Sequence, residues 1–565
     1  MSFDEKLDMN PIQIPPAEKA QSLPIRVGLL GMGTVGQGTF NVLHRNQEEI
    51  CRRAGRGIEI TMVAVRNADK ARTLTESAPG LSVVADPFAV VDHPDIDVVI
   101  EVIGGTAVAK ELVMRAIANG KHVITANKAL LAIHGNEIFA VAQARGVMVG
   151  FEAAVAGGIP IIKALRESLS ANRIEWIAGI INGTTNFILS EMRDKGLDFD
   201  TALRDAQRLG YAEADPAFDI EGVDAAHKTT LMSAIAFGIP LQFEKAYLEG
   251  ITQLGPQDIK YAEQLGYRIK LLGITKKTVK GIELRVHPSL VPVKRLIANV
   301  EGAMNAVMVH GDAVGTTLYY GKGAGSEPTA SAVIADLVDI TRLHTANAAQ
   351  RVPHLAFQPD AMSDTPVLSI DDIVTSYYLR LNVADKAGVL ANVTGILAEA
   401  GISIDAVLQR EADEVGGEGS TQTDLIILTH DCVEAKMNQA LAQMQALPTV
   451  LAPIVRIRKE ELASRGIDAE VIDLRSIRPI DKFTIINSVK KTNRCVVCEE
   501  GFPFASIGSE VSSILMEEAF DYLDAPVKRL ASLDVPLPYA ANLERLALPK
   551  AVNIIDAVLE VCYKK

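Results

Sequence analysis

The chain has 565 residues, of which 48% are hydrophobic and 22% are charged, with ordinary numbers of glycine and proline. This composition excludes a mostly disordered, collagen-like or coiled-coil chain, and the length predicts several domains. The formal net charge of −14 gives a nucleic-acid backbone no electrostatic attraction, so we expect no nucleic-acid partner. The apolar runs are interrupted before they reach the roughly 20 residues that a membrane span needs, so we expect no membrane partner.

Residues 1–24 are polar and contain prolines, and they lack the apolar core of an export signal. We expect a flexible tail and a cytoplasmic protein. From 25 to 150, short β-branched runs alternate with helical stretches, which predicts an α/β fold with a Rossmann-type doubly wound sheet. Over 151–350, strands mix with longer helices and glycine turns, which indicates a second, α+β domain. The proline-containing residues 351–374 have the composition of a linker.

A glycine-rich motif follows the first predicted strand and opens the first predicted helix. Its glycines permit a tight turn and let a pyrophosphate approach the helix N-terminus, so we predict a dinucleotide site. The alternative is a structural glycine turn. Arg66 ends the second strand where an NAD site usually places an acid; a cation there tolerates or favours the 2′-phosphate of NADP, and the alternative is an exposed loop arginine. The predicted cofactor residues of the motif are Gly31, Gly33, Thr34, Val35 and Gly36.

Two lysines are candidates for chemistry. If the segment after Gly222 is helical, Asp224 and Lys228 are four residues apart and share one face. On spacing alone, an ordinary helix ion pair is the better interpretation. Lys128 comes just past a predicted strand end, in the crevice where a nicotinamide would lie. On spacing alone, a solvated surface lysine is again the better interpretation.

Six segments, in order over about 25–345, together resemble homoserine dehydrogenase: GLLGMGTVGQG, VITANKALLAIHG, FEAAVAGGIPIIKALRE, GIINGTTNFIL, GYAEADPAFDIEGVDAAHK and GAGSEPTASAV. The resemblance implies reversible reduction of L-aspartate 4-semialdehyde to L-homoserine with NADP or NAD, on the route to threonine, methionine and isoleucine. It also implies a small-molecule substrate and a homodimer or homotetramer.

The resemblance assigns roles residue by residue. Lys228 matches the proton donor and Lys128 the lysine beside the nicotinamide, which also makes it a cofactor residue. Both ammonium groups would stabilise charge that grows on the aldehyde oxygen, and we expect each to lower the pKa of the other. Asp224 matches a position that orients the acid and holds the substrate. The other positions near substrate or cofactor are Glu213, Tyr211, Gly183, Thr184 and, for the cofactor, Gly325.

The loop from Val155 to Ile159 matches a family site for a sodium or potassium ion that backbone carbonyls bind. Val155, Gly157 and Ile159 are the expected ligands. The alternative is a tight glycine turn without metal.

Residues 375–457 predict the order strand, helix, strand, strand, helix, strand, which is ferredoxin-like. They resemble an ACT regulatory domain, whose effector binds at the turn between strand and helix. The matching residues are Asp385, Gly388, Val389 and Leu390. Threonine is the expected effector, and the alternative is a domain that serves only subunit packing.

Beyond about Lys459, residues 469–474 predict a strand, and helices are expected from Asp481 and from Ser506. Within 458–565, the segments GIDAEVIDLRSIRPID, CVVCEEGFPFASIGSEV and DVPLPYAANLE resemble the C-terminal, transketolase-type domain of the pyruvate dehydrogenase beta subunit. The thiamine-binding portion of that family is missing, so we expect no decarboxylase activity. A natural gene fusion, an engineered chimera and a gene-assembly error all fit this joint. The main prediction is an enzyme with a passive C-terminal appendage. The alternative is a scaffold that docks a 2-oxo acid dehydrogenase acyltransferase through the C-terminal domain.

Overall fold

The computed structural model describes residues 23–67, 80–347, 350–409, 421–462, 470–535 and 547–563. The predicted tail, 1–24, therefore falls almost wholly outside the described residues. The chain forms two compact units, 1–462 and 463–565. In the part of the chain that the structure describes, no helix is long and apolar enough to cross a membrane.

The first domain is a six-stranded sheet with the strand order β3-β2-β1-β4-β5-β6, in which every pairing is parallel. This order defines a dinucleotide-binding doubly wound fold and confirms the predicted Rossmann-type sheet. The strands are β1 (Ile25–Leu30), β2 (Ile58–Ala64), β3 (Ser82–Val84), β4 (Val98–Glu101), β5 (His122–Thr125) and β6 (Val149–Gly150).

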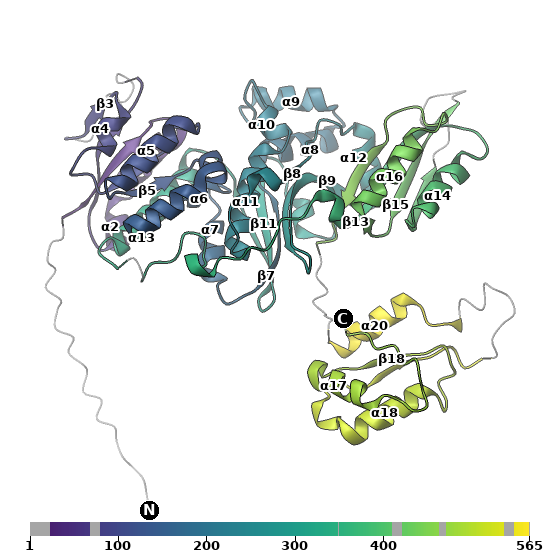
Figure 1. The fold of residues 1–565 in the computed structure, drawn as a ribbon. Coiled ribbons are helices and arrows are strands. Elements are labelled where there is room, and N and C mark those ends of the chain that lie inside the picture. Colours follow the sequence, from purple (N-terminus) through teal and green to yellow (C-terminus); the bar gives the residue numbers. More distant parts are fainter. Residues whose placement is uncertain are drawn as a thin grey trace, which may run out of the picture. The chain divides into compact units, whose positions relative to one another are not determined.

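Helices cover both faces of this sheet, because its strands carry apolar side chains on both sides. Residues of α4, α5 and α6 pack on one face, and residues of α1, α2 and α13 pack on the other. α13 comes late in the chain, within 151–350, yet it lies beside α2 in the first domain (Figure 1). The helices are α1 (Thr34–Arg45), α2 (Gln47–Ala54), α4 (Pro87–Val91), α5 (Ala107–Ala118), α6 (Lys128–Arg145) and α13 (Ser326–Leu343).

The second domain is built on strands of an 11-stranded sheet, whose strands from β13 to β17 belong to the third domain. Nine strands run in the order β12-β11-β7-β9-β10-β17-β13-β15-β14, and β8 and β16 pair beside this path with β10 and β13. Helix α11 is buried along nearly its whole length, because it packs on β9 and β10 and also contacts α6 of the first domain. The strands are β7 (Ile174–Ile180), β8 (Tyr247–Leu248), β9 (Tyr267–Lys277), β10 (Ile282–Pro292), β11 (Met304–Gly311) and β12 (Gly315–Lys322). The helices are α7 (Ile161–Lys163), α8 (Gly183–Lys195), α9 (Phe199–Arg208), α10 (Ala217–Ile220), α11 (Val223–Phe237) and α12 (Pro256–Gln264).

The third domain has the predicted ferredoxin-like order, with strands arranged β17-β13-β15-β14. Residues of α14 and α16 cover one face of these strands. Strand β17 joins the two domains, because it pairs with β10 on one side and with β13 on the other. The elements are β13 (Val374–Ala384), α14 (Val389–Glu399), β14 (Ile404–Gln409), β15 (Gln422–Thr429), β16 (Cys432–Val433), α16 (Glu434–Gln445) and β17 (Val455–Lys459).

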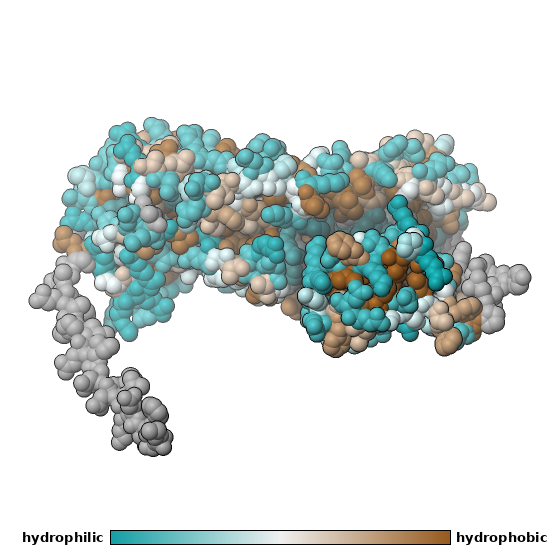
Figure 2. All heavy atoms as spheres, turned by 60° about the horizontal axis from the view of Figure 1, so that its bottom comes forward, coloured by the Kyte–Doolittle hydropathy of each residue, from teal (hydrophilic) through white to brown (hydrophobic). Residues whose placement is uncertain are grey.

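The unit 463–565 contains the helices predicted to begin after Asp481 and Ser506, and both residues cap them by accepting a backbone N–H. The strand expected at residues 469–474 was wrong: residues 470–474 form no strand, and Val471 is 89% exposed. Apolar side chains gather on the face of this unit that Figure 2 presents, and Phe483 and Phe504 are among its exposed residues. The elements are α17 (Lys482–Thr492), β18 (Val496–Cys498), α18 (Ile507–Glu518), β19 (Lys528–Leu530) and α20 (Ala551–Val561).

Candidate active site

The glycine-rich motif turns sharply between β1 and α1. Gly31 has φ +102°, which favours glycine, and a Cβ on Gly36 would lie only 2.1 Å from the carbonyl oxygen of Gly31. Around Gly33, in contrast, no heavy atom of the described residues lies within 4 Å of the Cβ position apart from its chain neighbours. Gly36 therefore closes the turn on the protein side, and Gly33 leaves open the side from which a pyrophosphate would approach Thr34 and Val35 at the start of α1.

Gly325 lies close to this turn, although almost 300 residues separate the two in the sequence. It has φ +126° and precedes α13, whose Ser326 hydroxyl donates a hydrogen bond of 2.9 Å to the carbonyl of Thr34. A Cβ on Gly38 would lie 2.5 Å from the Ser326 carbonyl oxygen, so α1 and α13 meet at their N-terminal ends. Arg66 is exposed two residues after the end of β2, at the position where the sequence predicts a contact with the 2′-phosphate of NADP.

One buried carboxylate holds both candidate lysines. Asp224 and Lys228 lie on one face of α11, and Lys228 Nζ is 2.7 Å from Asp224 Oδ2. Lys128, the first residue of α6 after β5, reaches the other oxygen, with Nζ 3.0 Å from Asp224 Oδ1. The carboxyl edge of the nucleotide sheet and the buried helix of the second domain therefore meet at Asp224.

The two lysines have opposite pKa shifts. Burial lowers the pKa of Lys228, and the charge of Lys128 lowers it further, against the opposing effect of Asp224. The charge of Asp224 raises the pKa of Lys128, which is more exposed. The expected mutual lowering is thus confirmed for Lys228 and wrong for Lys128, because the prediction omitted the carboxylate between them. Asp224 itself is buried, but the two lysines hold its pKa below the usual value.

Lys228 has a donor left for a ligand. Its ammonium group donates to Asp224 and, at 2.7 Å, to the carbonyl of Ile181. Because an ammonium group has three N–H bonds, one remains for an oxygen atom of a substrate.

The turn before α8 lies against this cluster. Asn182 caps α8 through its side chain, and its Nδ2 donates to Asp224 Oδ2 at 2.9 Å and to Asp219 Oδ1 at 2.7 Å. The single hydroxyl proton of Thr184 faces two acceptors, Asp219 Oδ2 at 2.9 Å and the carbonyl of Tyr211 at 2.7 Å from Oγ1. The start of α8 at Gly183 is therefore tied to the carboxylate of Asp224.

The remaining predicted substrate residues lie at the surface beside this turn. The ring of Tyr211 packs on Phe187 with centroids 4.7 Å apart and is 47% exposed. The side chain of Glu213 is exposed, and its charge is among those that raise the pKa of Lys128. Both residues are therefore open to a bound molecule.

The predicted cation loop is buried and sharply turned. Ala156 has φ +55° and Gly157 φ +50°, and the side chains of Val155 and Ile159 are buried. A Cβ on Gly157 would lie 2.6 Å from the carbonyl oxygen of Gly323, which leads into Gly325. The loop offers backbone carbonyls beside the buried side chains of Val155 and Ile159, and carbonyl oxygens are the type of ligand that fits an alkali cation.

The predicted effector turn lies between β13 and α14. Gly388 has φ +89° and ends the turn, and Asp385 donates its backbone N–H to the carbonyl of Thr421 at 2.8 Å. Leu390 is 39% exposed, whereas Val389 is buried in the domain core. The turn is therefore accessible to a ligand in a single chain.

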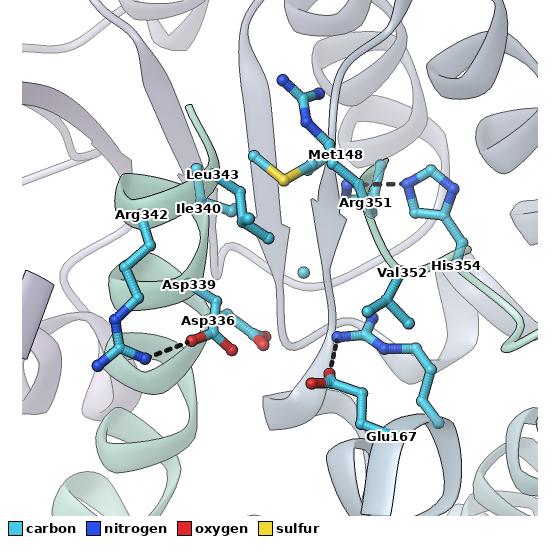
Figure 3. A pocket seen from close by; sticks show the side chains of 13 residues that line it. Met148, Glu167, Asp336, Asp339, Ile340, Arg342, Leu343, Arg351, Val352 and His354 are labelled. Atoms are coloured by element: carbon cyan, nitrogen blue, oxygen red, sulfur yellow. Dashed lines mark hydrogen bonds and ion pairs between the residues drawn. The ribbon is translucent and has the colours of Figure 1, made fainter. Parts of the chain in front are cut away.

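A cavity of about 200 Å³ lies elsewhere, between β6, α13 and residues 351–354 (Figure 3). Asp336 and Asp339 point into the same region from α13, and Arg351 and His354 flank it. None of its lining residues is a predicted substrate or cofactor residue. The candidate cluster of Asp224, Lys128 and Lys228 is thus defined by its ion pairs and not by this cavity.

Sequence reasoning missed Asn182 and Asp219. Asn182 precedes Gly183 and stands three residues before Thr185, whose N–H it accepts at 2.8 Å, so a helix-cap signal was available. Asp219 lies within the segment GYAEADPAFDIEGVDAAHK, but no spacing rule pointed to this residue.

The parallel nucleotide-binding sheet, the glycine turn and the paired lysines at its carboxyl edge define a nicotinamide-nucleotide-dependent oxidoreductase. Comparison with known families agrees. The profile described as the NAD binding domain of homoserine dehydrogenase matches residues 31–152, and the homoserine dehydrogenase profile matches 160–338. An ACT domain matches 377–449, and the C-terminal domain of transketolase matches 455–554.

Curated relatives and solved structures are similar over most of the chain. A homoserine dehydrogenase from Pseudomonas aeruginosa is 60% identical over 439 residues, covering 78% of this chain and 99% of the relative. One from Neisseria gonorrhoeae is 57% identical over the same shares of each chain. A homoserine dehydrogenase structure from Thiobacillus denitrificans is 66% identical with a TM-score of 0.74, covering 78% of this chain and 99% of that one. The chain therefore belongs to the homoserine dehydrogenase family.

Proposed function

We propose that the chain catalyses the reversible reduction of L-aspartate 4-semialdehyde to L-homoserine, in the biosynthesis of threonine, methionine and isoleucine. The observation that carries this proposal is the buried carboxylate of Asp224, which holds Lys128 and Lys228 together at the carboxyl edge of the nucleotide sheet. Membership of the homoserine dehydrogenase family supports the choice of substrate.

When bound, the nicotinamide supplies or accepts the hydride. In the reduction, negative charge grows on the aldehyde oxygen, and the remaining N–H of Lys228 donates to that oxygen and transfers its proton. Lys128 adds a second positive charge beside the same oxygen. In the oxidation, neutral Lys228 takes the proton of the homoserine hydroxyl, and its lowered pKa favours this form.

The amino-acid end of the substrate would lie at the start of α8. Backbone N–H groups of Gly183 and Thr184 are at a helix N-terminus, where a carboxylate is stabilised. The exposed carboxylate of Glu213 suits the substrate ammonium, with Tyr211 alongside.

Steady-state assays test this function directly. Purified protein should reduce NADP in the presence of homoserine, and Lys228→Met should abolish the activity. Lys277→Met is the matched control, because Lys277 is an exposed lysine at the end of β9 in the same domain. A Lys228→Met variant that keeps wild-type kcat would contradict the proposed role.

NADP is the preferred cofactor in this proposal because of Arg66. An exposed guanidinium after β2 pairs well with a 2′-phosphate, whereas the ribose hydroxyls of NAD gain little from it. Arg66→Asp should raise the KM for NADP about tenfold or more and leave that for NAD nearly unchanged. An equal effect on both cofactors would contradict this preference.

A sodium or potassium ion would bind the carbonyls of Val155, Gly157 and Ile159. Its positive charge would stabilise the sharp turn at Ala156 and, through the contact with Gly323, the loop that ends at Gly325. Replacement of both ions by tetramethylammonium should lower the thermal midpoint if the ion is bound.

Threonine is the proposed effector, binding at the turn of Asp385 and Gly388 across a pair of ACT domains in a homodimer or homotetramer. The accessible turn and the shared sheet support this regulation, which requires threonine to favour one state of the enzyme. A rate that stays flat with threonine in the millimolar range would exclude it.

The scaffold alternative has less support, because the residues that match the family site are intact. Its discriminating result is a Lys228→Met variant that is inactive yet still forms a stable complex with a 2-oxo acid dehydrogenase acyltransferase.

A further inference from the structure

Asn305 is a buried asparagine whose amide group has no partner within the described residues. The residue lies in β11 and is 1% exposed, and neither Nδ2 nor Oδ1 makes a hydrogen bond. Such a group is costly, because burial removes its hydrogen bonds to water and supplies nothing in return. Unsatisfied buried groups are rare in folded proteins and call for an explanation.

The amide lies where two loops of the proposed site approach each other. A Cβ on Gly323 would lie 1.9 Å from Asn305 Nδ2, so only glycine fits beside the amide on that side. A Cβ on Gly183 would lie 3.6 Å from Asn305 Oδ1. One amide therefore faces both the turn that begins α8 and the loop that ends at Gly325.

These two loops serve different ligands in the proposed function. The turn at Gly183 is where the substrate carboxylate would bind. The loop from Gly323 to Gly325 leads to Ser326, which bonds to Thr34 in the cofactor turn. The same loop contacts Gly157 of the cation loop. A group between them can respond to either ligand.

We infer that Asn305 is a positioning residue that couples cofactor binding to substrate binding. When ligands bind, its amide, which is unpaired in the unliganded form, makes hydrogen bonds with the backbone of the Gly183 turn and of the Gly323 loop. The cost of the unpaired amide is then relieved only in the ligand-bound form, so each ligand favours the binding of the other. This inference rests on the proposed positions of substrate and cofactor.

A second asparagine in the chain provides a matched control. Asn186 is also buried in this region, but its Nδ2 donates to the carbonyl of Gly302 at 2.8 Å and to two further carbonyls. Its Oδ1 accepts from Lys270 Nζ at 3.1 Å. Replacement of Asn186 by leucine removes made hydrogen bonds, whereas replacement of Asn305 removes none in the unliganded protein.

The experiment compares Asn305→Leu, Asn305→Ala and Asn186→Leu in the full chain. Thermal midpoints are measured without ligand, with NADP, with homoserine and with both, and kcat and KM are measured for homoserine oxidation. We expect the midpoint of unliganded Asn305→Leu to equal or exceed that of wild type, while Asn186→Leu falls. Both Asn305 variants should lose the extra stabilisation that the two ligands give together, and KM for homoserine should rise about tenfold, the equivalent of one lost hydrogen bond.

Three results would overturn the inference. The first is unchanged cooperation between the ligands with unchanged KM in both Asn305 variants. The second is a midpoint of the unliganded Asn305 variants that falls as far as that of Asn186→Leu. The third is failure of both Asn305 variants to fold. The second and third results would both show that the amide already has a partner in the unliganded protein. Wild-type protein that does not oxidise homoserine would instead refute the proposed function. The rise of the midpoint with NADP alone shows whether the cofactor binds, and this separates failure of the inference from failure of the proposed function.

Discussion

The carboxylate of Asp224 offers the sharpest test of the catalytic cluster. Asp224→Asn keeps the shape of the side chain and one acceptor oxygen but removes the charge that both lysines share, at 2.7 and 3.0 Å. At an effective dielectric constant of about 20, two unit charges about 3 Å apart attract by roughly 5 kcal/mol, and loss of one partner of a buried pair costs about 3–5 kcal/mol.

The loss acts on the protonation of Lys228. With about 3 kcal/mol less stabilisation, the proton affinity of Lys228 falls by about a hundredfold, because 1.4 kcal/mol corresponds to a factor of ten. Its pKa, which burial already lowers, falls further. The limb of the pH profile on which homoserine oxidation rises should therefore move to lower pH.

The assay is kcat/KM for homoserine with NADP between about pH 6 and 10, with a thermal midpoint to verify folding. Asp205→Asn is the control, because Asp205 lies on α9 and pairs at 3.1 Å with the exposed Arg208. A limb that stays in place or moves to higher pH in folded Asp224→Asn would refute the assignment of Lys228 as the proton-transfer group.

Other consequences can be measured separately. Burial raises the pKa of Asp336 to about 6. The stability that this side chain contributes is therefore fully present below its unfolded pKa near 4 and is lost as the pH rises through 6. At pH 8, Asp336→Asn should have a free energy of unfolding up to about 3 kcal/mol above wild type in denaturant titrations. Gly36→Ala should abolish cofactor binding by calorimetry, since the methyl group would lie 2.1 Å from the Gly31 carbonyl oxygen. Arg458→Met should lower the free energy of unfolding by about 3–5 kcal/mol, because the fully buried guanidinium pairs with carboxylates from two domains. A chain that ends after Leu462 should keep wild-type kcat, and loss of activity would show that the appended unit is required.

Local pattern carried the sequence analysis through the nucleotide domain. Strand runs and the glycine motif are signals that act over a few residues, and the structure confirms the parallel sheet that they predicted. In the unit 463–565, the helices expected from Asp481 and Ser506 are also confirmed. Packing between segments that are distant in the sequence could not be predicted from local patterns. Nothing near residue 326 indicates that α13 returns to cover the nucleotide sheet, because the partner of its apolar face lies in α1 and α2.

The candidate site was likewise predictable only where its residues are close in sequence. Spacing placed Asp224 and Lys228 on one helical face, but only the fold brings Lys128 to the other oxygen of the carboxylate. For the same reason the raised pKa of Lys128 could not be foreseen, since its cause is a residue almost a hundred positions away. The strand expected at 469–474 failed because an apolar run alone does not supply a pairing partner.

Strand β17 limits how freely the regulatory domain can be exchanged. Although residues 375–457 read as a separable module, their last strand is hydrogen-bonded into the catalytic sheet at Ser289 and Leu290. A graft from another protein would have to bring a matching final strand, or the recipient sheet would be left with an open edge on β10. Engineers who wish to change the feedback regulation of such an enzyme should therefore place the C-terminal crossover before Val455 and retain the native strand.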